Sequence, residues 1–303
     1  MPYHCGPALL RATLLGCLLL APPSQAIPQQ PAAQPTLDQV LSRLEDNFNV
    51  YLHSIPSLFA DEHVVSSMSI NARPTLNSTT DSIFRLRPSV EGKLIDLQES
   101  RQVRLVDHQP ATPDQVLAGP TILRNAFSSA PGFLLPQLKP CYDYQLHPGK
   151  RLHRNLVHIL DYSLKSPLPS GAVCPVTEPH QGRAYLDPAS LEIVRFEQHR
   201  RSHEIDPRTI GSWEWFIDYQ PVTLNGKTFW LPKTITSRSW GDVDPSQQAD
   251  AGSGTSNSRG PSPRSSGRQV QRQDWSFVAT YRNYHLLTVT SKIVPTVEAD
   301  PRQ

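Results

Sequence analysis

The sequence has no clear excess of charge of either sign. Its 303 residues include 29 Lys and Arg and 27 Asp and Glu, which gives a formal net charge of +2. A domain that binds nucleic acid usually carries a basic excess, because it must neutralise phosphates. The balance therefore argues against a nucleic-acid partner and against any strongly charged one.

Glycine is also scarce, at 15 positions, whereas proline occupies 30, about twice its average usage. Proline lacks a backbone N–H, so it interrupts helices and the central strands of sheets. This composition excludes an all-helical bundle. It favours short elements, sheet edges and turns.

The N-terminus has no apolar run long enough to cross a bilayer, but it has the pattern of an export signal. Arg11 precedes the apolar run 12–21 (ATLLGCLLLA), whose 10 residues are half of the roughly 20 that a spanning helix needs. Two prolines and the small-residue motif at 24–26 (SQA) follow, which predicts cleavage after Ala26. Two alternatives remain open: a buried core helix, and lipidation of Cys17 within 14–17 (LLGC).

Cysteine is limited to four positions, of which Cys5 and Cys17 would leave with the signal. In an exported chain the remaining pair, Cys141 and Cys174, predicts one disulfide. Closing its loop of about 33 residues would contribute roughly 3–4 kcal/mol. Two free thiols are the alternative. The spacing is not Cys-x-x-Cys, so nothing supports redox catalysis.

A helix is predicted to follow a flexible leader at 27–36 (IPQQPAAQPT). Thr36 can cap its first turn, and the helix should end before Pro56. Apolar residues recur at helical spacing, which indicates one face packed on something large; they are Leu37, Val40, Leu41, Leu44, Phe48, Tyr51 and Leu52.

Strand patterns dominate the remainder of the chain. Alternating residues predict strands over 57–67, 81–88 and 92–106, with a polar loop over 71–80. Short helices are expected at 113–118 and 123–127, and a turn-rich piece at 131–138. Further strands are predicted over 155–164, 182–186, 191–198, 213–219, 223–224, 227–231 and 274–282, and a last one near 287–293.

Two turns and one insertion connect the later strands. The sequence 187–190 (DPAS) is a turn signal, and Asn225-Gly226 is a strong hairpin signal. Residues 241–273 form a Ser/Gly/Arg/Gln tract with too little apolar surface to offset its ordering entropy. We therefore expect a disordered hairpin tip there.

The order of elements predicts the fold class. No β-α-β alternation with long helices is present, which argues against a doubly wound sheet. The expected fold is α+β: a curved antiparallel sheet, or incomplete β-barrel, forming one domain over 37–298. Its N-terminal helix and short mid-chain helices would cover the concave face.

Motifs that carry catalysis are missing. The sequence has no G-x-S-x-G, H-E-x-x-H or dinucleotide-binding glycine loop. The segment 226–228 (GKT) resembles the end of a phosphate loop, but the required upstream glycine is Pro221, so a hairpin turn explains it better. Without such motifs we expect a protein that is not an enzyme and has no cofactor.

Three weaker clusters are candidate sites. His199 and His203 have the four-residue spacing of metal ligands on a helix, but their context is a strand running into a loop, so no metal site is expected. The acid–imidazole cluster at 61–63 (DEH) lies on a strand, where neighbours point to opposite faces. Asp143, with His147, His153 and His158, shows no ligand spacing. An exposed polar surface is the simpler interpretation of each.

The aromatic residues are more informative. All five Trp lie in the C-terminal strands, and aromatics on one face of a curved sheet can fill a core or line an apolar cavity. For any single residue the plain core role is the simpler one.

A family resemblance is carried by three segments. Residues 182–197 (GRAYLDPASLEIVRFE) combine an aromatic, an Asp-Pro turn and a strand ending in Arg and Phe. Residues 215–232 (WFIDYQPVTLNGKTFWLP) contain Tyr-x-Pro-Val and Trp-Leu-Pro, and 281–295 (YRNYHLLTVTSKIVP) contain Tyr-x-x-Tyr. Together they resemble the LolA/LolB-like outer-membrane lipoprotein-sorting proteins, including periplasmic sigma-factor regulators with the same domain. The long insertion, the cysteine pair and the proline content depart from that pattern.

The resemblance implies a half-barrel whose helices form a lid over an apolar cavity for acyl chains. The partner would be a lipid or a lipoprotein acyl chain, or an envelope protein, in the periplasm or at the outer membrane. The residues expected to face the cavity are Trp213, Trp215, Ile217, Phe229, Leu231, Phe277 and Leu287, and those expected in the lid are Leu41, Leu44 and Phe48.

Two other functions remain as alternatives. One is a periplasmic sensor or interaction module with a fully packed core and no ligand. The other is a hydrolase of envelope polymers, which would require residues 61–63 to meet Asp143 or His158 in a cleft.

Overall fold

The computed structural model describes residues 34–91, 94–112, 130–152, 155–174, 176–206, 209–243 and 271–287. The signal peptide with Cys17, most of the leader, the short helices expected at 113–118 and 123–127, and the strand expected beyond Leu287 lie outside these residues. The chain divides after Gln34, and the unit from Pro35 to Gln303 contains all the elements below. None of the described helices has the length and apolarity to span a membrane.

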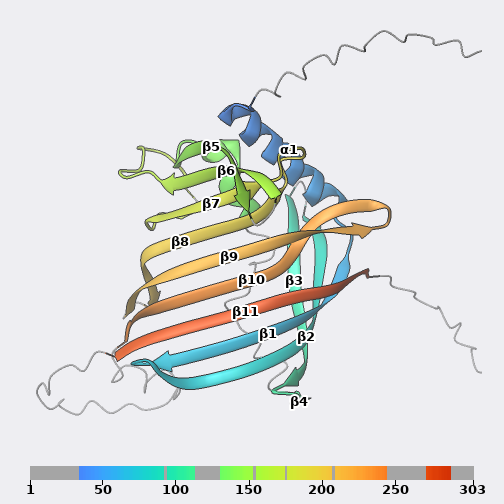
Figure 1. Cartoon of the computed structure of the whole chain (residues 1–303), viewed down its shortest axis with the longest axis vertical. Helices are drawn as coiled ribbons and strands as arrows, with labels where there is room; N and C mark the ends of the chain where they lie inside the picture. The colour runs from blue at the N-terminus through green and yellow to red at the C-terminus, as the bar shows by residue number, and fades with distance from the viewer. Residues whose placement is uncertain are drawn as a thin grey trace, which may run out of the picture. The chain divides into compact units, whose positions relative to one another are not determined.

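The first element, α1 (Leu37–Ser54), begins and ends as the sequence predicts (Figure 1). The Thr36 hydroxyl accepts a hydrogen bond from the Gln39 backbone N–H at 3.3 Å, and the Gln39 side chain accepts one from the Thr36 N–H at 2.8 Å. This reciprocal capping box satisfies two N–H groups that the first turn leaves unpaired. The face that carries Val40, Leu41 and Leu44 is buried.

The eleven described strands form one antiparallel sheet in the order β4-β3-β2-β1-β11-β10-β9-β8-β7-β6-β5. Strands that neighbour each other in sequence pair, except β4 and β5, and β11 returns to pair with β1. The sheet therefore stays open, with β4 and β5 as its edges. The strands are β1 (Leu58–Ile70), β2 (Arg73–Glu91), β3 (Leu94–Val106), β4 (Gln109–Pro110), β5 (Tyr142–Leu152), β6 (Asn155–Leu164), β7 (His180–Leu186), β8 (Ile193–Asp206), β9 (Thr209–Leu224), β10 (Lys227–Val243) and β11 (Gln271–Leu286).

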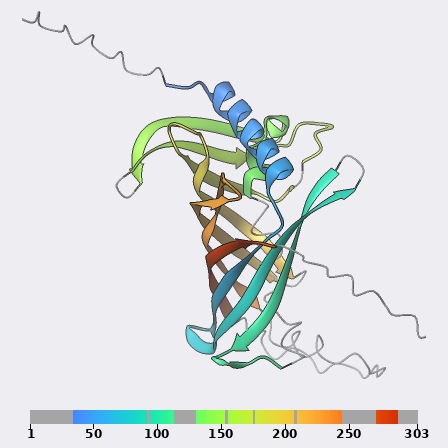
Figure 2. The same cartoon turned by 90° about the vertical axis from the view of Figure 1, so that its right-hand side faces the viewer.

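The sheet curves, and its concave side holds the core (Figure 2). One register row crosses six strands and is almost completely buried; it consists of Ala184, Phe196, Ile217, Ile235, Ala279 and Val64. Above it, α1 contacts β3 and β5, two strands near opposite edges of the sheet, together with the 3-10 helices η2 (Ala130–Leu134) and η3 (Pro136–Leu138). The predicted α+β half-barrel, with helices over its concave face, is confirmed.

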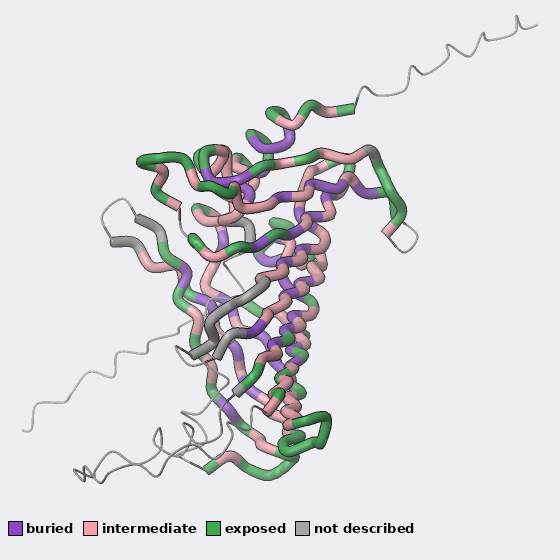
Figure 3. Tube along the Cα trace, turned by 90° about the vertical axis from the view of Figure 1, so that its left-hand side faces the viewer, coloured by how far each residue is buried: buried purple, intermediate pink, exposed green. Residues whose placement is uncertain are grey.

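Two loop predictions need correction. Residues 73–80 were expected to be loop but belong to β2, and only Asn71 and Ala72, both at positive φ, form the turn. The segment is polar, but Thr is a good strand former, and pairing with β1 from Val64 to Ile70 fixes its register. This turn is exposed (Figure 3). In the expected 241–273 insertion, the described ends are paired strand, with Val243 opposite Gln271; the remainder lies outside the described residues.

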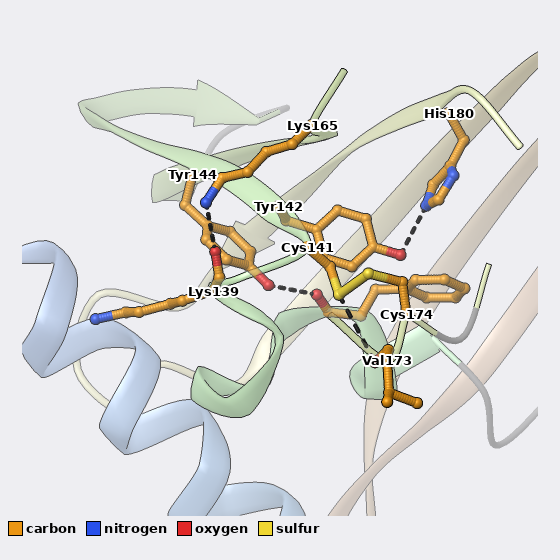
Figure 4. The surroundings of a disulfide bond; sticks show 9 residues. Lys139, Cys141, Tyr142, Tyr144, Lys165, Val173, Cys174 and His180 are labelled. Carbon is orange, nitrogen blue, oxygen red and sulfur yellow. Dashed lines mark hydrogen bonds between the residues drawn. A yellow bond between two sulfur atoms is a disulfide. The ribbon is translucent and has the colours of Figure 1, made fainter. Parts of the chain in front are cut away.

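The predicted disulfide between Cys141 and Cys174 is formed (Figure 4). It ties the start of edge strand β5 to the loop between β6 and β7. Hydrogen bonds reinforce this corner: Tyr144 donates to the Phe133 carbonyl at 2.9 Å, and Lys165 donates to the Lys139 carbonyl at 2.7 Å. The disulfide therefore holds the edge of the sheet beside the helices that cover it.

A buried ion pair lies on the concave side beneath α1. Arg101 on β3 donates through Nε to both carboxylate oxygens of Glu62 on β1, at 2.9 and 3.1 Å. Its Nη2 lies 3.5 Å from Glu99, and its guanidinium is 5.0 Å from the centre of the Phe84 ring. Only 1% of the Glu62 side chain is exposed, so this carboxylate depends on Arg101 to compensate its charge.

We predict that Cys141→Ala/Cys174→Ala lowers the free energy of unfolding by about 3–4 kcal/mol, because the unfolded chain regains the entropy of the 33-residue loop. Urea denaturation with and without reductant measures this. Reductant should lower the wild-type midpoint and leave that of the double variant unchanged. A wild-type midpoint that ignores reductant would contradict the prediction.

We predict that Arg101→Leu costs about 3–5 kcal/mol at pH 7, because it removes the cation beside Glu62 and Glu99, whose side chains are 1% and 2% exposed. The triple variant Glu62→Leu/Glu99→Leu/Arg101→Leu should recover at least half of that loss. Denaturant unfolding of the two variants under the same conditions provides the comparison. Equal losses would show that the two buried carboxylates are not the cause.

Candidate functional site

A cavity of about 330 Å³ lies between α1 and the rim of the sheet at the β9–β10 hairpin. Its volume is at the small end of the roughly 300–1,000 Å³ typical of ligand pockets. Its walls come from α1, from the start of β8 and from the hairpin. The lining residues are Leu44, Asn47, Phe48, Val50, Tyr51, Ser54, Glu192, Ile193, Tyr219, Lys227, Thr228, Phe229 and Trp230.

The helical wall follows from the spacing of the sequence. Leu44, Phe48 and Tyr51 are four and three residues apart, so they lie on one face of α1. Asn47, on the same side, donates from Nδ2 to the Ser190 carbonyl at 3.1 Å. This bond fixes the helix to the turn that precedes β8.

That turn is the one the Asp-Pro signal predicts. The Asp187 carboxylate accepts hydrogen bonds from the backbone N–H groups of Ala189 and Ser190 and from the Ser190 hydroxyl, at 2.9–3.1 Å. Burial opposes ionisation, but the hydrogen bonds from Ser190 and Ala189 hold the pKa of Asp187 below its usual value. The turn delivers Glu192 and Ile193 to the cavity wall.

The opposite wall is the hairpin that Asn225-Gly226 predicts. Both turn residues have positive φ, 48° and 75°, which Asn and Gly tolerate best. The turn places Phe229, which is 6% exposed, opposite α1. Its ring meets that of Tyr51 edge to face, with centroids 6.5 Å apart. The two walls therefore meet through these aromatic rings.

Several polar groups face this largely apolar space. Burial raises the pKa of Tyr51, and nearby Glu99 raises it further. Burial and the neighbouring Tyr51 raise the pKa of Tyr219. Both phenols are therefore neutral donors. Burial also raises the pKa of Glu192, although Arg43 opposes the shift.

Three of the residues predicted to form the site line this cavity: Phe229 from the sheet, and Leu44 and Phe48 from the lid. Of the others, Leu41, Trp215, Ile217, Leu231 and Phe277 are buried in the core, and Trp213 packs against it. Leu287 directly follows β11, and its N–H donates to the Ser57 carbonyl at 2.8 Å. Their contact with a ligand stays a prediction.

The Trp213 and Trp215 side chains form an aromatic pair on β9. Their rings meet edge to face at 4.7 Å, and Trp213 donates from Nε1 to the Ser237 hydroxyl at 2.5 Å. The Arg200 guanidinium lies 5.0 Å from the centre of the Trp213 ring. These contacts give the two Trp side chains a structural role in packing within the sheet.

Four of the other cavity residues, which the sequence did not predict as site residues, are Tyr51, Tyr219, Glu192 and Ile193. Tyr51 belongs to the apolar stripe of the predicted helix, and Tyr219 continues the face of Trp213 and Trp215. Both are amphipathic aromatics on an apolar face, which is the signal that distinguishes them. Glu192 and Ile193 line the cavity because α1 packs against the turn at 187–190, which directly precedes them.

The side chains of Asp61, Glu62 and His63 on β1 do not point to a common site. Glu62 points to the concave side, whereas Asp61 accepts a hydrogen bond from Asn283 and His63 lies 2.6 Å from the Asp81 carboxylate. Five strands separate β1 from β6, which carries His158. The two groups that a hydrolase would need are therefore not brought together.

The two histidines weighed as metal ligands lie on β8, a strand rather than a helix. His199 Nδ1 is 3.1 Å from the Glu214 carboxylate, and the His203 side chain lies outside the described residues. Nearby, His147 pairs with Asp161 at 2.9 Å. Among the residues whose placement is described, no group of three or more His, Cys, Asp or Glu side chains could hold a metal ion.

Comparison with known proteins gives structural matches only. Neither a protein-family model nor a curated protein matches the chain. A Vibrio parahaemolyticus domain described as outer membrane lipoprotein-sorting matches at 11% identity, over 85% of this chain and 96% of its own, with a TM-score of 0.40. A DUF1329 family protein from Desulfovibrio piger matches at 10% identity, over 86% and 96%, with a TM-score of 0.38.

MucB matches at 9% identity, over 84% of this chain and 100% of its own, with a TM-score of 0.24; the MucA/MucB complex of Pseudomonas aeruginosa is also among the matches. At these identities and TM-scores the likeness concerns the fold and says nothing of a ligand or partner for this chain. A lipoprotein-sorting domain, the kind of protein that the sequence resembles, is thus among the matches.

Proposed function

We propose that this protein binds a lipid or the acyl chain of a lipoprotein in the cavity between α1 and the β9–β10 hairpin. The observation that carries the proposal is the cavity itself, whose walls are mainly apolar and aromatic. Each CH₂ group moved from water into such a space contributes roughly 0.8 kcal/mol. An apolar cavity of the right shape is therefore a sufficient mechanism, without a nucleophile or a cofactor.

In this proposal α1 acts as the lid. It is joined to the sheet side of the cavity by the Asn47–Ser190 hydrogen bond and by the Tyr51–Phe229 ring contact. The exposed Val50 lies at the edge of the cavity and marks its entrance. The buried residues Trp215, Ile217, Leu231 and Phe277 form the rigid core on which the cavity is built.

The compartment in the proposal is outside the cytoplasm, in the periplasm or at the outer membrane. The export signal predicted at residues 1–26 and the disulfide between Cys141 and Cys174 both support it, since structural disulfides persist in oxidising compartments. An acyl chain carried through such a compartment would need shielding from water.

A second candidate is a sensor or interaction module with a packed core. The burial of Trp215, Ile217 and Phe277 favours it, because much of the concave face is already filled by side chains. The two candidates differ in one measurable respect, which is whether an acyl chain occupies the cavity.

We predict that the purified protein binds a fluorescent fatty acid and that Phe48→Glu weakens this binding at least tenfold, because a carboxylate would then face the acyl chain. Thr228→Trp, at an exposed position on the opposite wall, should weaken binding by narrowing the cavity. Fluorescence titration measures both. Val65→Glu, on the outer side of β1, is the matched control and should bind as the wild type does.

Native mass spectrometry of the purified protein provides an independent check for bound lipid. If no lipid copurifies and no fluorescent fatty acid binds or is displaced, the lipid-binding proposal is wrong and the packed interaction module is favoured. Equal affinities of wild type, Phe48→Glu and Thr228→Trp would place the lipid elsewhere on the protein.

A further inference from the structure

One carboxylate in the cavity wall has no partner within the described part of the chain. Glu192 follows the turn at 187–190 and lines the cavity between α1 and the β9–β10 hairpin. Its side chain is only partly buried, and neither a hydrogen bond nor an ion pair to its carboxylate is found. Unlike the hydroxyl of Tyr219, its oxygens keep accessible surface. A molecule that enters the cavity can therefore reach this carboxylate.

The charged groups around Glu192 compensate it only in part. Burial raises its pKa, Arg43 on α1 lowers the pKa through its charge without forming an ion pair, and Asp187 raises it. Lys227 lies on the exposed hairpin, at the other wall. An alkyl chain that filled the cavity would displace water from the carboxylate and offer no hydrogen-bond donor in return. A plain hydrocarbon chain therefore fits the apolar walls but not this group.

A second acceptor lies at the same end of the cavity. Asn47 on α1 donates from Nδ2 to the Ser190 carbonyl at 3.1 Å, and no hydrogen bond to its own Oδ1 is found among the described residues. The Ser190 hydroxyl accepts a hydrogen bond from the Glu192 N–H at 3.3 Å. Asn47 and Glu192 therefore both adjoin Ser190, and together they present acceptors to a ligand that brings donors.

The aromatic side chains of the cavity favour a cation as the source of those donors. Phe48, Tyr51, Phe229 and Trp230 line the cavity, and aromatic rings attract ammonium groups, more strongly where water is excluded. An ammonium group has three N–H donors and supplies the positive charge that Glu192 needs when it loses water. A neutral hydroxyl brings a donor without the charge, and an anionic head group would be repelled by Glu192.

We propose that the ligand is an apolar chain that bears a protonated primary amine, and that Glu192 accepts hydrogen bonds from this amine. The inference rests on the proposed function and deepens it, because it adds the head group to the chain. The chain lies against Leu44, Phe48 and Phe229, and the ammonium group lies at Glu192 and Asn47. The cavity then selects cationic amphiphiles over neutral and anionic ones.

The test compares chains of equal length that carry different head groups. Decylamine is an ammonium ion at neutral pH, 1-decanol carries a neutral hydroxyl, and decanoate carries a carboxylate. Each is titrated alone into the purified protein by isothermal titration calorimetry, at concentrations where it is dissolved as a monomer. For the wild type we expect decylamine to bind about tenfold more tightly than the other two, which is the lower range for a hydrogen bond to a charged group.

The variant Glu192→Gln should weaken decylamine binding about tenfold and leave the affinity for decanol within about twofold, because the shape is kept and only the charge is lost. Unchanged decanol binding also shows that the variant is folded. Glu45→Gln is the matched control, since it removes the same charge from a residue of α1 that does not line the cavity. It should bind all three ligands as the wild type does.

The outcomes separate this inference from the proposed function. If none of the three ligands binds, lipid binding itself is wrong. If all three bind alike, or decanoate binds most tightly, the cavity holds an apolar chain without recognising an amine, and only the inference is overturned. A preference for decylamine that survives Glu192→Gln, or that Glu45→Gln removes to the same extent, would also overturn it, because the preference would then arise elsewhere or from overall charge.

Discussion

The pairing of β1 with β11 is the interaction on which the remainder of the structure depends. Every other pair in the described sheet joins strands that are neighbours in sequence, so each could form as a local hairpin or meander. Only this pair, from Leu58 opposite Leu286 to Ile70 opposite Gln273, joins strands β1–β4 to strands β5–β10. Without it the chain would form two smaller sheets, and the buried row that runs from Ala184 on β7 to Val64 on β1 would be interrupted between Ala279 and Val64.

The same pairing also determines the position of α1. Only three residues separate the end of α1 from the start of β1. The position of β1 in the middle of the sheet therefore also determines where the C-terminal end of the helix lies. The helix then spans from β3 to β5, across the opening that the unclosed sheet leaves. The cavity lies between α1 and the β9–β10 hairpin, where the helix does not pack closely against the sheet.

Local signals in the sequence predicted the local parts of this arrangement. Thr36 and Pro56 marked the ends of α1, Asn225-Gly226 marked the hairpin, and alternation marked most strands. The prediction was wrong where pairing with a distant strand decides the structure. Residues 73–80 have the polar composition of a loop, but their hydrogen bonds to β1 make them part of a strand. Within the site, Leu44, Phe48 and Phe229 could be chosen because each lies on a recognisable apolar face. Glu192 could not, since its place in the cavity wall depends on how α1 packs against the sheet, which no single segment encodes.

The cavity walls also set an order of events. The walls come from distant parts of the chain: α1 precedes all the described strands, and the hairpin ending at Trp230 follows most of them. The cavity therefore forms only after β9 and β10 have folded and α1 has packed against them. A ligand of the kind proposed could not bind to a partly folded chain, so it would have to meet the finished protein.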